Sequence, residues 1–285
     1  MSMDGESRSK PGNADLEVIK AFGEEWSRFN QAELSEPDRR AIFDDYFHLF
    51  PWERLSLQAV GADIGCGSGR WSMLAAPRVG VLHCVDPSGA ALAVARSNLG
   101  SFGNVRFHQA GVEALPFPDE SLDFAYSLGV LHHVPDTVEA IRSVAAKLKS
   151  GAPFLIYLYY AFDNRPYWFR LLWRVSDVLR RVVSRLPFPL RYVASQVMAA
   201  CVYWPLARTA LLLDRLGCLP ATWPLAYYRD KSFYVMRTDA LDRFGTKLEQ
   251  RFTRRQIREM LETSGFTDVR FSEAPPMWCA VCIRR

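Results

Sequence analysis

Three glycines and an acid at close spacing are the first residues in this sequence whose types could bind a small molecule. They are Asp63, Gly65, Gly67 and Gly69, in a stretch that reads as a short apolar strand followed by a turn. Glycine adopts positive φ and lets a ligand approach the backbone closely, because it has no Cβ. A helix beginning directly after the turn would direct N–H groups and partial positive charge at that ligand. The dinucleotide pattern G-x-G-x-x-G is not met, since Arg70 occupies its third glycine position.

A second acid follows at the spacing expected for a ribose-binding carboxylate. The run Val81–Asp86 is short, apolar and ends in Asp86, about twenty residues after the glycines. The two carboxylate oxygens of Asp86 suit the two adjacent hydroxyls of a ribose. Two further runs, over residues 105–117 and 122–134, complete a series of four strand-and-loop motifs.

This series resembles the class I S-adenosylmethionine (SAM) methyltransferases, in particular the small-molecule branch typified by ubiquinone and menaquinone biosynthesis. The resemblance implies SAM as cofactor, S-adenosylhomocysteine as product, and a set of cofactor-binding residues. It places Asp63 near the methionine ammonium, Asp86 on the ribose and Pro87 beside the adenine. The implied set is Tyr46, Asp63, Gly65, Cys66, Gly67, Gly69, Asp86, Pro87, Gly111, Val112, Glu113, Ser127 and Gly129.

One position departs from the family pattern. Relatives commonly carry an aspartate where this chain has Gly111, and that carboxylate accepts a hydrogen bond from the adenine amine. Gly111 has no side chain to do so. Either Glu113 or a backbone carbonyl takes this role, or the adenine is held less specifically.

The catalytic residues are less defined by the sequence, because SAM already carries an activated methyl group. Alignment suffices for an amine or carboxylate nucleophile, whereas a phenol or enol benefits from a base. The candidates are His132, His133 and Tyr159, with packing as the alternative role of the histidines. Gly129 and His132 stand where quinone-type O-methyltransferases often have carboxylates, which argues against a metal-assisted mechanism. We therefore expect no metal site.

The elements that must position these residues alternate between short β-branched runs and helical runs over residues 58–158. Such alternation predicts a doubly wound, Rossmann-like α/β fold, and the resemblance implies seven mostly parallel strands. We assign the SAM-binding core to residues 57–160 and 251–285. All candidate ligand residues of the core then lie at the carboxyl ends of strands, including Tyr157–Tyr160 on an expected fifth strand at 153–160.

The core is preceded by a tail and two helices. Residues 1–13 are polar and are expected to be disordered. Residues 14–56 are expected to form two amphipathic cap helices, the second capped by Ser35. In the resembling family such helices close over the ligands, which makes Tyr46 and Phe47 candidates to touch them.

Residues 161–250 are expected to form a mainly helical lid inserted after the fifth strand. Between Arg165 and Arg191 there are seven arginines, one aspartate and no lysine. Apolar residues from Trp168 to Leu186 share one helical face, opposite Arg170, Arg174, Arg181 and Arg185. Two interpretations stay open: a lid helix with its apolar face on the core, or a membrane-surface helix over residues 165–191. The apolar stretch 192–207 is too short and too interrupted to predict a membrane span.

Composition narrows the function classes further. The chain has 285 residues and a net charge of +4, which does not call for a nucleic-acid partner. The six scattered cysteines suggest reduced thiols in a cytoplasmic protein, membrane-associated if the basic helix binds lipid. We expect SAM-dependent methyl transfer to a hydrophobic small-molecule or lipid-linked acceptor at oxygen or carbon. The alternatives are a SAM-using cyclase or lyase on the same fold, and a peripheral membrane-binding module.

Overall fold

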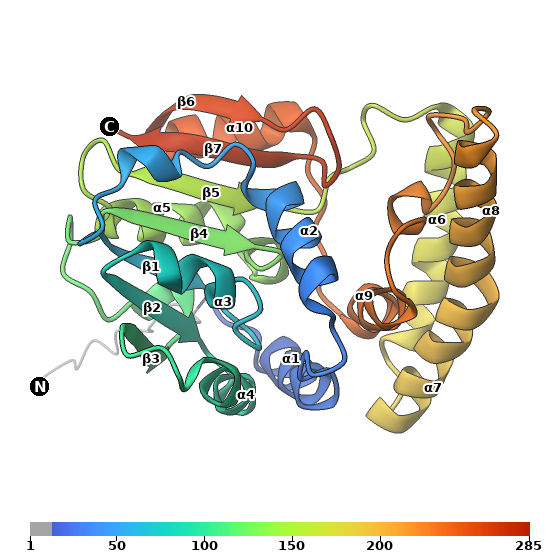
Figure 1. Ribbon diagram of the computed structural model, residues 1–285, viewed down its shortest axis with the longest axis horizontal. Coiled ribbons are helices and arrows are strands. Elements are labelled where there is room, and N and C mark those ends of the chain that lie inside the picture. The colour runs from blue at the N-terminus through green and yellow to red at the C-terminus, as the bar shows by residue number, and fades with distance from the viewer. Residues whose placement is uncertain (1–12) are drawn as a thin grey trace, which may run out of the picture.

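The computed structural model describes residues 13–285, and its centre is a seven-stranded sheet (Figure 1). Its strands are β1 (Val60–Ile64), β2 (Val81–Asp86), β3 (Val105–Gln109), β4 (Phe124–Leu128), β5 (Pro153–Tyr157), β6 (Phe266–Phe271) and β7 (Cys279–Arg284). The order is β3-β2-β1-β4-β5-β7-β6. Strands β1 to β5 run parallel, whereas β7 pairs antiparallel with both β5 and β6. The predicted doubly wound, mostly parallel fold is confirmed.

Helices cover both faces of this sheet. One face packs on α2 (Glu36–Phe47), the short α3 (Ser72–Ala75) and α4 (Gly89–Leu99). The other packs on α5 (Thr137–Lys147) and α10 (Arg254–Thr263). The core follows the strand alternation, since Leu155 lies in one apolar cluster and its neighbours Phe154 and Ile156 lie in the other. Short 3₁₀ turns fill the connections at Trp52–Arg54, Ala76–Arg78, Val112–Ala114 and Leu131–His133.

The N-terminal helices form as predicted. Helix α1 (Leu16–Arg28) is capped by Asp15, and α2 is capped by Ser35, whose side chain accepts from the Asp38 N–H. The predicted tail lies outside the described residues except for Asn13. Asn13 exchanges two hydrogen bonds of 2.7 Å with the backbone of Asp136. Asn13, the last residue of the predicted tail, is therefore held against the core.

Three expected elements differ in extent. Strand β5 ends at Tyr157, so Tyr159 and Tyr160 lie in the loop beyond it. Strand β4 ends at Leu128, and His132 and His133 belong to the following 3₁₀ turn. Helix α3 has four residues and begins at Ser72, so the glycine turn does not sit directly at the start of a long helix. The glycine turn therefore offers a ligand its own backbone N–H groups rather than the dipole of a long helix.

The insertion forms a separate helical layer (Figure 1). It contains α6 (Tyr167–Val183), α7 (Phe188–Met198), a π-helical turn (Ala199–Tyr203), α8 (Trp204–Arg215), a 3₁₀ turn (Ala226–Tyr228) and α9 (Phe233–Gly245). In Figure 1, α9 lies between α1 and the outer helices α6 to α8. The apolar stretch 192–207, which was expected to be interrupted, lies within one continuous helix, because the π turn joins α7 to α8. Among the described residues, this 28-residue helix alone has the length and composition to cross a membrane.

Candidate functional site

The glycine turn between β1 and α3 adopts the conformation that its sequence predicts. Gly65 and Gly67 have φ of 79° and 53°. A Cβ on Gly65 would collide with the side chain of Val130, and one on Gly67 would lie 2.8 Å from Nε1 of Trp26. Trp26 belongs to α1, so the first helix packs directly on the turn. Only glycine allows both this packing and this backbone geometry.

Asp86 points toward the turn. Its Oδ2 accepts from the Gly67 N–H at 2.9 Å, and its Oδ1 accepts from the Ser88 N–H at 2.8 Å. Burial raises the pKa of Asp86 to about 6, against the lowering effect of these two bonds. Each carboxylate oxygen has a second lone pair. Asp86 can therefore accept two further hydrogen bonds from a ligand while it holds the turn.

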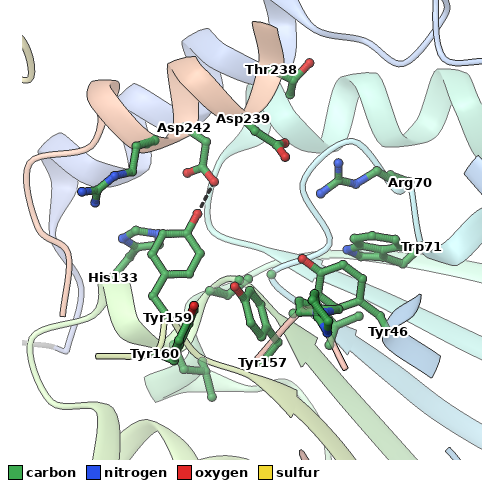
Figure 2. A pocket seen from close by; sticks show the side chains of 18 of the residues that line it. Tyr46, Arg70, Trp71, His133, Tyr157, Tyr159, Tyr160, Thr238, Asp239 and Asp242 are labelled. Carbon is green, nitrogen blue, oxygen red and sulfur yellow. Dashed lines mark hydrogen bonds between the residues drawn. The ribbon is translucent and has the colours of Figure 1, made fainter. Parts of the chain in front are cut away.

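A cavity of about 820 Å³ opens above the carboxyl ends of the strands (Figure 2). Its floor is formed by the glycine turn, Asp86 and Gly129, and α1 and α2 close one side. Residues of helix α9 and of the lid segment 219–231 also line the cavity. A Cβ on Gly129 would meet nothing within 4 Å, so the backbone there is open to the cavity. The candidate residues on its wall are Tyr46, Gly65, Cys66, Asp86, Pro87, Gly111, Val112, Glu113, Gly129, His133 and Tyr159.

Five residues of the implied cofactor-binding set and the catalytic candidates do not border this cavity, namely Asp63, Gly67, Gly69, Ser127 and His132. Asp63 is buried behind the turn, where Ser72 Oγ donates to its Oδ2 at 2.6 Å. Burial raises the pKa of Asp63 to about 7, in spite of that hydrogen bond. Ser127 donates to the Ile64 carbonyl at 2.9 Å and joins β4 to β1. The positions of Asp63 and Ser127 agree with support of the turn rather than with the expected ligand contacts.

The Gly111 position is explained by its neighbour. A Cβ on Gly111 would overlap the carboxylate of Glu113, whose oxygens occupy the space into which a side chain at 111 would project. Both residues border the cavity. The sequence leaves three alternatives open for recognition of the adenine amine. This geometry favours the one in which the Glu113 carboxylate takes that role.

The paired histidines differ from each other. His132 is fully buried, and its ring lies against that of Tyr159 with centroids 3.9 Å apart. The Nδ1 of His133 contacts the Leu248 carbonyl at 2.6 Å. Burial lowers the pKa of His133 to about 4 and that of His132 well below its usual value. Both rings are neutral near pH 7 and are weak bases, so packing is the role that fits them better.

Helix α9 contributes two acids to the cavity that the sequence analysis missed. Figure 2 shows Asp239 and Asp242 projecting from α9 on the side of Arg70 and Tyr159. The Tyr159 hydroxyl donates to Asp242, and the Tyr228 hydroxyl donates to Asp239 at 2.9 Å. Burial raises the pKa of each acid to about 6. Their i, i+3 spacing, which places both acids on one face of a helix, was the available sequence indication.

Two further missed residues complete the polar wall. Glu25 of α1 is 3% exposed and borders the cavity, and its Oε1 has no hydrogen-bond partner among the described residues. Burial, and then the negative charges of Asp242 and Asp239, raise the pKa of Glu25. The Arg70 guanidinium lies over Trp71 at 4.3 Å from the ring centroid. A buried acid with an unpaired oxygen and a nearby cation are suited to a ligand that carries both charges.

The two aromatic candidates on α2, Tyr46 and Phe47, lie in different surroundings. Tyr46 borders the cavity, with its ring 5.2 Å from that of Tyr157. Phe47 is buried in the core against Tyr126, so its expected ligand contact is wrong. All three tyrosines at the end of β5, including Tyr160, border the cavity. Strand alternation does not separate Tyr160 from the other two, because the strand has ended before it.

Comparison with known proteins agrees with this geometry. A family model described as "Methyltransferase domain" matches residues 62–156. The chain is 39% identical over 104 residues to the uncharacterized methyltransferase YcgJ of Bacillus subtilis, covering 36% of this chain and 41% of that protein. It is 34% identical over 119 residues to the ubiquinone/menaquinone biosynthesis C-methyltransferase UbiE of Shewanella sediminis, covering 37% and 47%. The matches thus span less than half the length of these relatives.

One solved structure shares the fold over most of the chain. A SAM-dependent methyltransferase from Aquifex aeolicus superposes with a TM-score of 0.50 at 12% identity, covering 90% of this chain and 97% of that one. Within residues 13–285, no group of three or more potential metal-ligating His, Cys, Asp or Glu side chains occurs. The motifs, the sheet order and the matched domain lead to one assignment: residues 62–156 match a methyltransferase domain, and the chain has the fold of the class I SAM-dependent methyltransferases.

Proposed function

We propose that this protein transfers the methyl group of SAM to a hydrophobic acceptor, at a phenolic or enolic oxygen or at an adjacent carbon. The observation that carries the proposal is the single cavity that joins the Asp86 end of the sheet to an aromatic, acid-bearing end beneath the lid. A cofactor and an acceptor can therefore meet without crossing solvent. The names of the UbiE relatives support a quinone-type acceptor, small or lipid-linked.

The residues present fit the cofactor. Asp86 has free lone pairs for the ribose hydroxyls, and Glu113 provides a carboxylate for the adenine amine. Arg70 and Glu25 offer a cation and an unpaired acid for the two charges of the amino-acid end. When bound, SAM supplies an electrophilic methyl group on a sulfonium, so the protein has to align the acceptor and exclude water.

The acceptor end combines aromatic side chains with a base. The rings that border it are those of Tyr46, Tyr157, Tyr159, Tyr203, Trp223 and Tyr227. Asp242 accepts from Tyr159 through Oδ2, while its Oδ1 has no partner among residues 13–285. With a pKa of about 6, this oxygen can accept the proton of a phenol near pH 7. A matched base contributes about 10²–10⁴-fold to such a reaction.

A labelled-methyl assay tests this function. The protein is incubated with SAM carrying a labelled methyl group and a prenylated quinol that lacks a ring methyl, dispersed in detergent. We expect label in the organic extract, a product heavier by one methylene unit, and S-adenosylhomocysteine. Release of methylthioadenosine would instead indicate a lyase, and cofactor binding without a methylated quinol would reject the quinol as acceptor.

A further inference from the structure

Exposed apolar side chains are concentrated on one part of the molecule. Within residues 13–285, seventeen large apolar side chains are exposed, and fourteen of them lie between Tyr167 and Leu216. They are Tyr167, Trp168, Leu171, Leu172, Val175, Val178, Leu179 and Val182 on α6, and Leu190, Val193, Val197, Trp204, Leu212 and Leu216 on or directly after α7–α8. A clustered set of this kind marks an interaction site rather than ordinary surface. We call it the outer apolar face.

Helix α6 is oriented opposite to the expectation for a lid helix. Its inward side carries Asp177 and Arg180, which pair at 2.7 Å, and Arg180 also donates to the Thr246 carbonyl at 2.8 Å. Its apolar stripe faces outward, with Val175 63% and Val178 64% exposed. The interpretation that places the apolar stripe of α6 on the core is therefore wrong.

The α7–α8 helix shows the same arrangement. Its inner side has small residues such as Ser195, Ala199 and Ala207, and the two alanines pack in one cluster with Val183 of α6 and Met236 of α9. Arg191 fixes it to the body by donating to the Gly245 carbonyl at 3.1 Å and pairing with Glu24 at 3.0 Å. In its most apolar stretch of 18 residues, only 22% is buried. Because its inner side is held in this way, the geometry favours a helix that lies along a surface over one that spans a bilayer.

We propose that the outer apolar face docks on an anionic lipid bilayer. Arg170, Arg174, Arg181 and Arg185 are exposed like the apolar stripe of α6, so they stand beside it rather than opposite it as the sequence predicts. Arginine beside exposed Trp168 and Trp204 is the composition of an interfacial helix, in which rings enter the headgroup region and cations contact anionic lipid. A symmetric contact with a second copy would bring these arginines against their own equivalents, which disfavours that occupant.

The outer apolar face also suits the proposed function, although its docking on lipid does not depend on that function. Residues of the same helical layer, Phe169 and Tyr203, border the cavity. A bilayer on the outer face would thus lie next to the acceptor end, where a lipid-linked acceptor would enter. Binding to lipid can be measured without any acceptor, so the two proposals can fail independently.

Vesicle co-sedimentation of the full chain tests the docking. We expect the protein to pellet with phosphatidylcholine vesicles that contain phosphatidylglycerol, and less at high salt or with phosphatidylcholine alone. The triple variant Leu171→Gln, Val175→Gln, Val178→Gln should bind at least about tenfold less. The matched control Leu16→Gln, Leu57→Gln changes exposed apolar residues elsewhere and should bind as the unmodified chain does.

Two readouts keep the test decisive. The triple variant should keep its thermal unfolding transition and its S-adenosylhomocysteine binding, because the three side chains are exposed. Brominated lipids should quench the fluorescence of Trp168 and Trp204, which is checked with Trp168→Phe and Trp204→Phe. The proposal is overturned if the unmodified chain does not bind anionic vesicles, or if the folded triple variant binds equally well. A dimer in solution that the same substitutions dissociate would identify a second copy as the occupant.

Discussion

Removing the Glu113 carboxylate tests how this chain recognises the adenine of its cofactor. In Glu113→Ala no acidic side chain remains at the position where Glu113 now fills the space above Gly111. A hydrogen bond to a charged acceptor contributes about 1.5–3 kcal/mol when it is buried. Since Glu113 is exposed at the cavity wall, we take about 1–1.5 kcal/mol, which corresponds to about fivefold to tenfold weaker binding of S-adenosylhomocysteine.

Calorimetry with two ligands isolates this contact. S-inosylhomocysteine replaces the amine donor by a carbonyl, so the unmodified chain should bind it less tightly than S-adenosylhomocysteine, whereas Glu113→Ala should bind both alike. Gly111→Asp alone should weaken binding, because its side chain would overlap Glu113. Gly111→Asp combined with Glu113→Ala should restore both affinity and discrimination, as a coupled pair would.

The control for these variants is Glu53→Ala, which removes an exposed glutamate away from the cavity. Unchanged affinity and unchanged discrimination in Glu113→Ala would refute the reasoning. So would a double variant that binds no better than either single one.

Three further predictions concern the base, the buried acids and the turn. If Asp242 is the base, activity in the quinol assay should rise with pH through about 6, and Asp242→Asn should lower it by about 10²–10⁴-fold. A pH profile that is flat between pH 5 and 8 would instead favour His133 as the base, since its pKa is about 4. The folded-state pKa of Asp63 lies above its ordinary value of 3.8, so its stabilising contribution is complete below pH 3.8 and is lost as pH rises to about 7. Asp63→Asn should therefore raise the free energy of unfolding at pH 8 by up to about 4 kcal/mol and hardly change it at pH 4, as denaturant unfolding will show; equal effects at both pH values would contradict this. Gly67→Ala should lower the free energy of unfolding by about 1–3 kcal/mol, because Gly67 has a positive φ and lies close to Trp26. The matched control is Gly103→Ala, where a Cβ meets nothing within 4 Å. Equal unfolding midpoints for the two variants would argue against the turn geometry.

The sequence was sufficient to predict the fold and much of the cofactor end. Glycine spacing, an acid at a strand end and alternating apolar runs all reflect local backbone requirements, which is why Gly65 and Asp86 lie where they were expected. Side chains also alternate along β7, where Cys279 and Cys282 lie in opposite apolar clusters. In these cases the pattern depends on a few neighbouring residues.

The parts that could not be predicted depend on packing between distant segments. Asp63 has the right spacing for a ligand contact, but Ser72 and Tyr126 enclose it from behind the turn. Asp239 and Asp242 follow the glycines by some 170 residues in the sequence and reach the cavity only because α9 folds back over it. The outward direction of the apolar stripe on α6 is also a tertiary property, since helical periodicity identifies a stripe but not the side on which it lies.

The most direct test of the account is calorimetric titration of the unmodified chain and Asp86→Asn with S-adenosylhomocysteine and SAM. Asparagine has a single carbonyl oxygen, so it keeps one of the two backbone hydrogen bonds that Asp86 accepts from Gly67 and Ser88, and it lacks the charge that strengthens bonds from the ribose hydroxyls. We predict that the unmodified chain binds both ligands at one site, and that Asp86→Asn binds them at least about tenfold more weakly while unfolding cooperatively. No binding to the unmodified chain, or equal binding by the folded variant, would contradict a cofactor site between the glycine turn and Asp86.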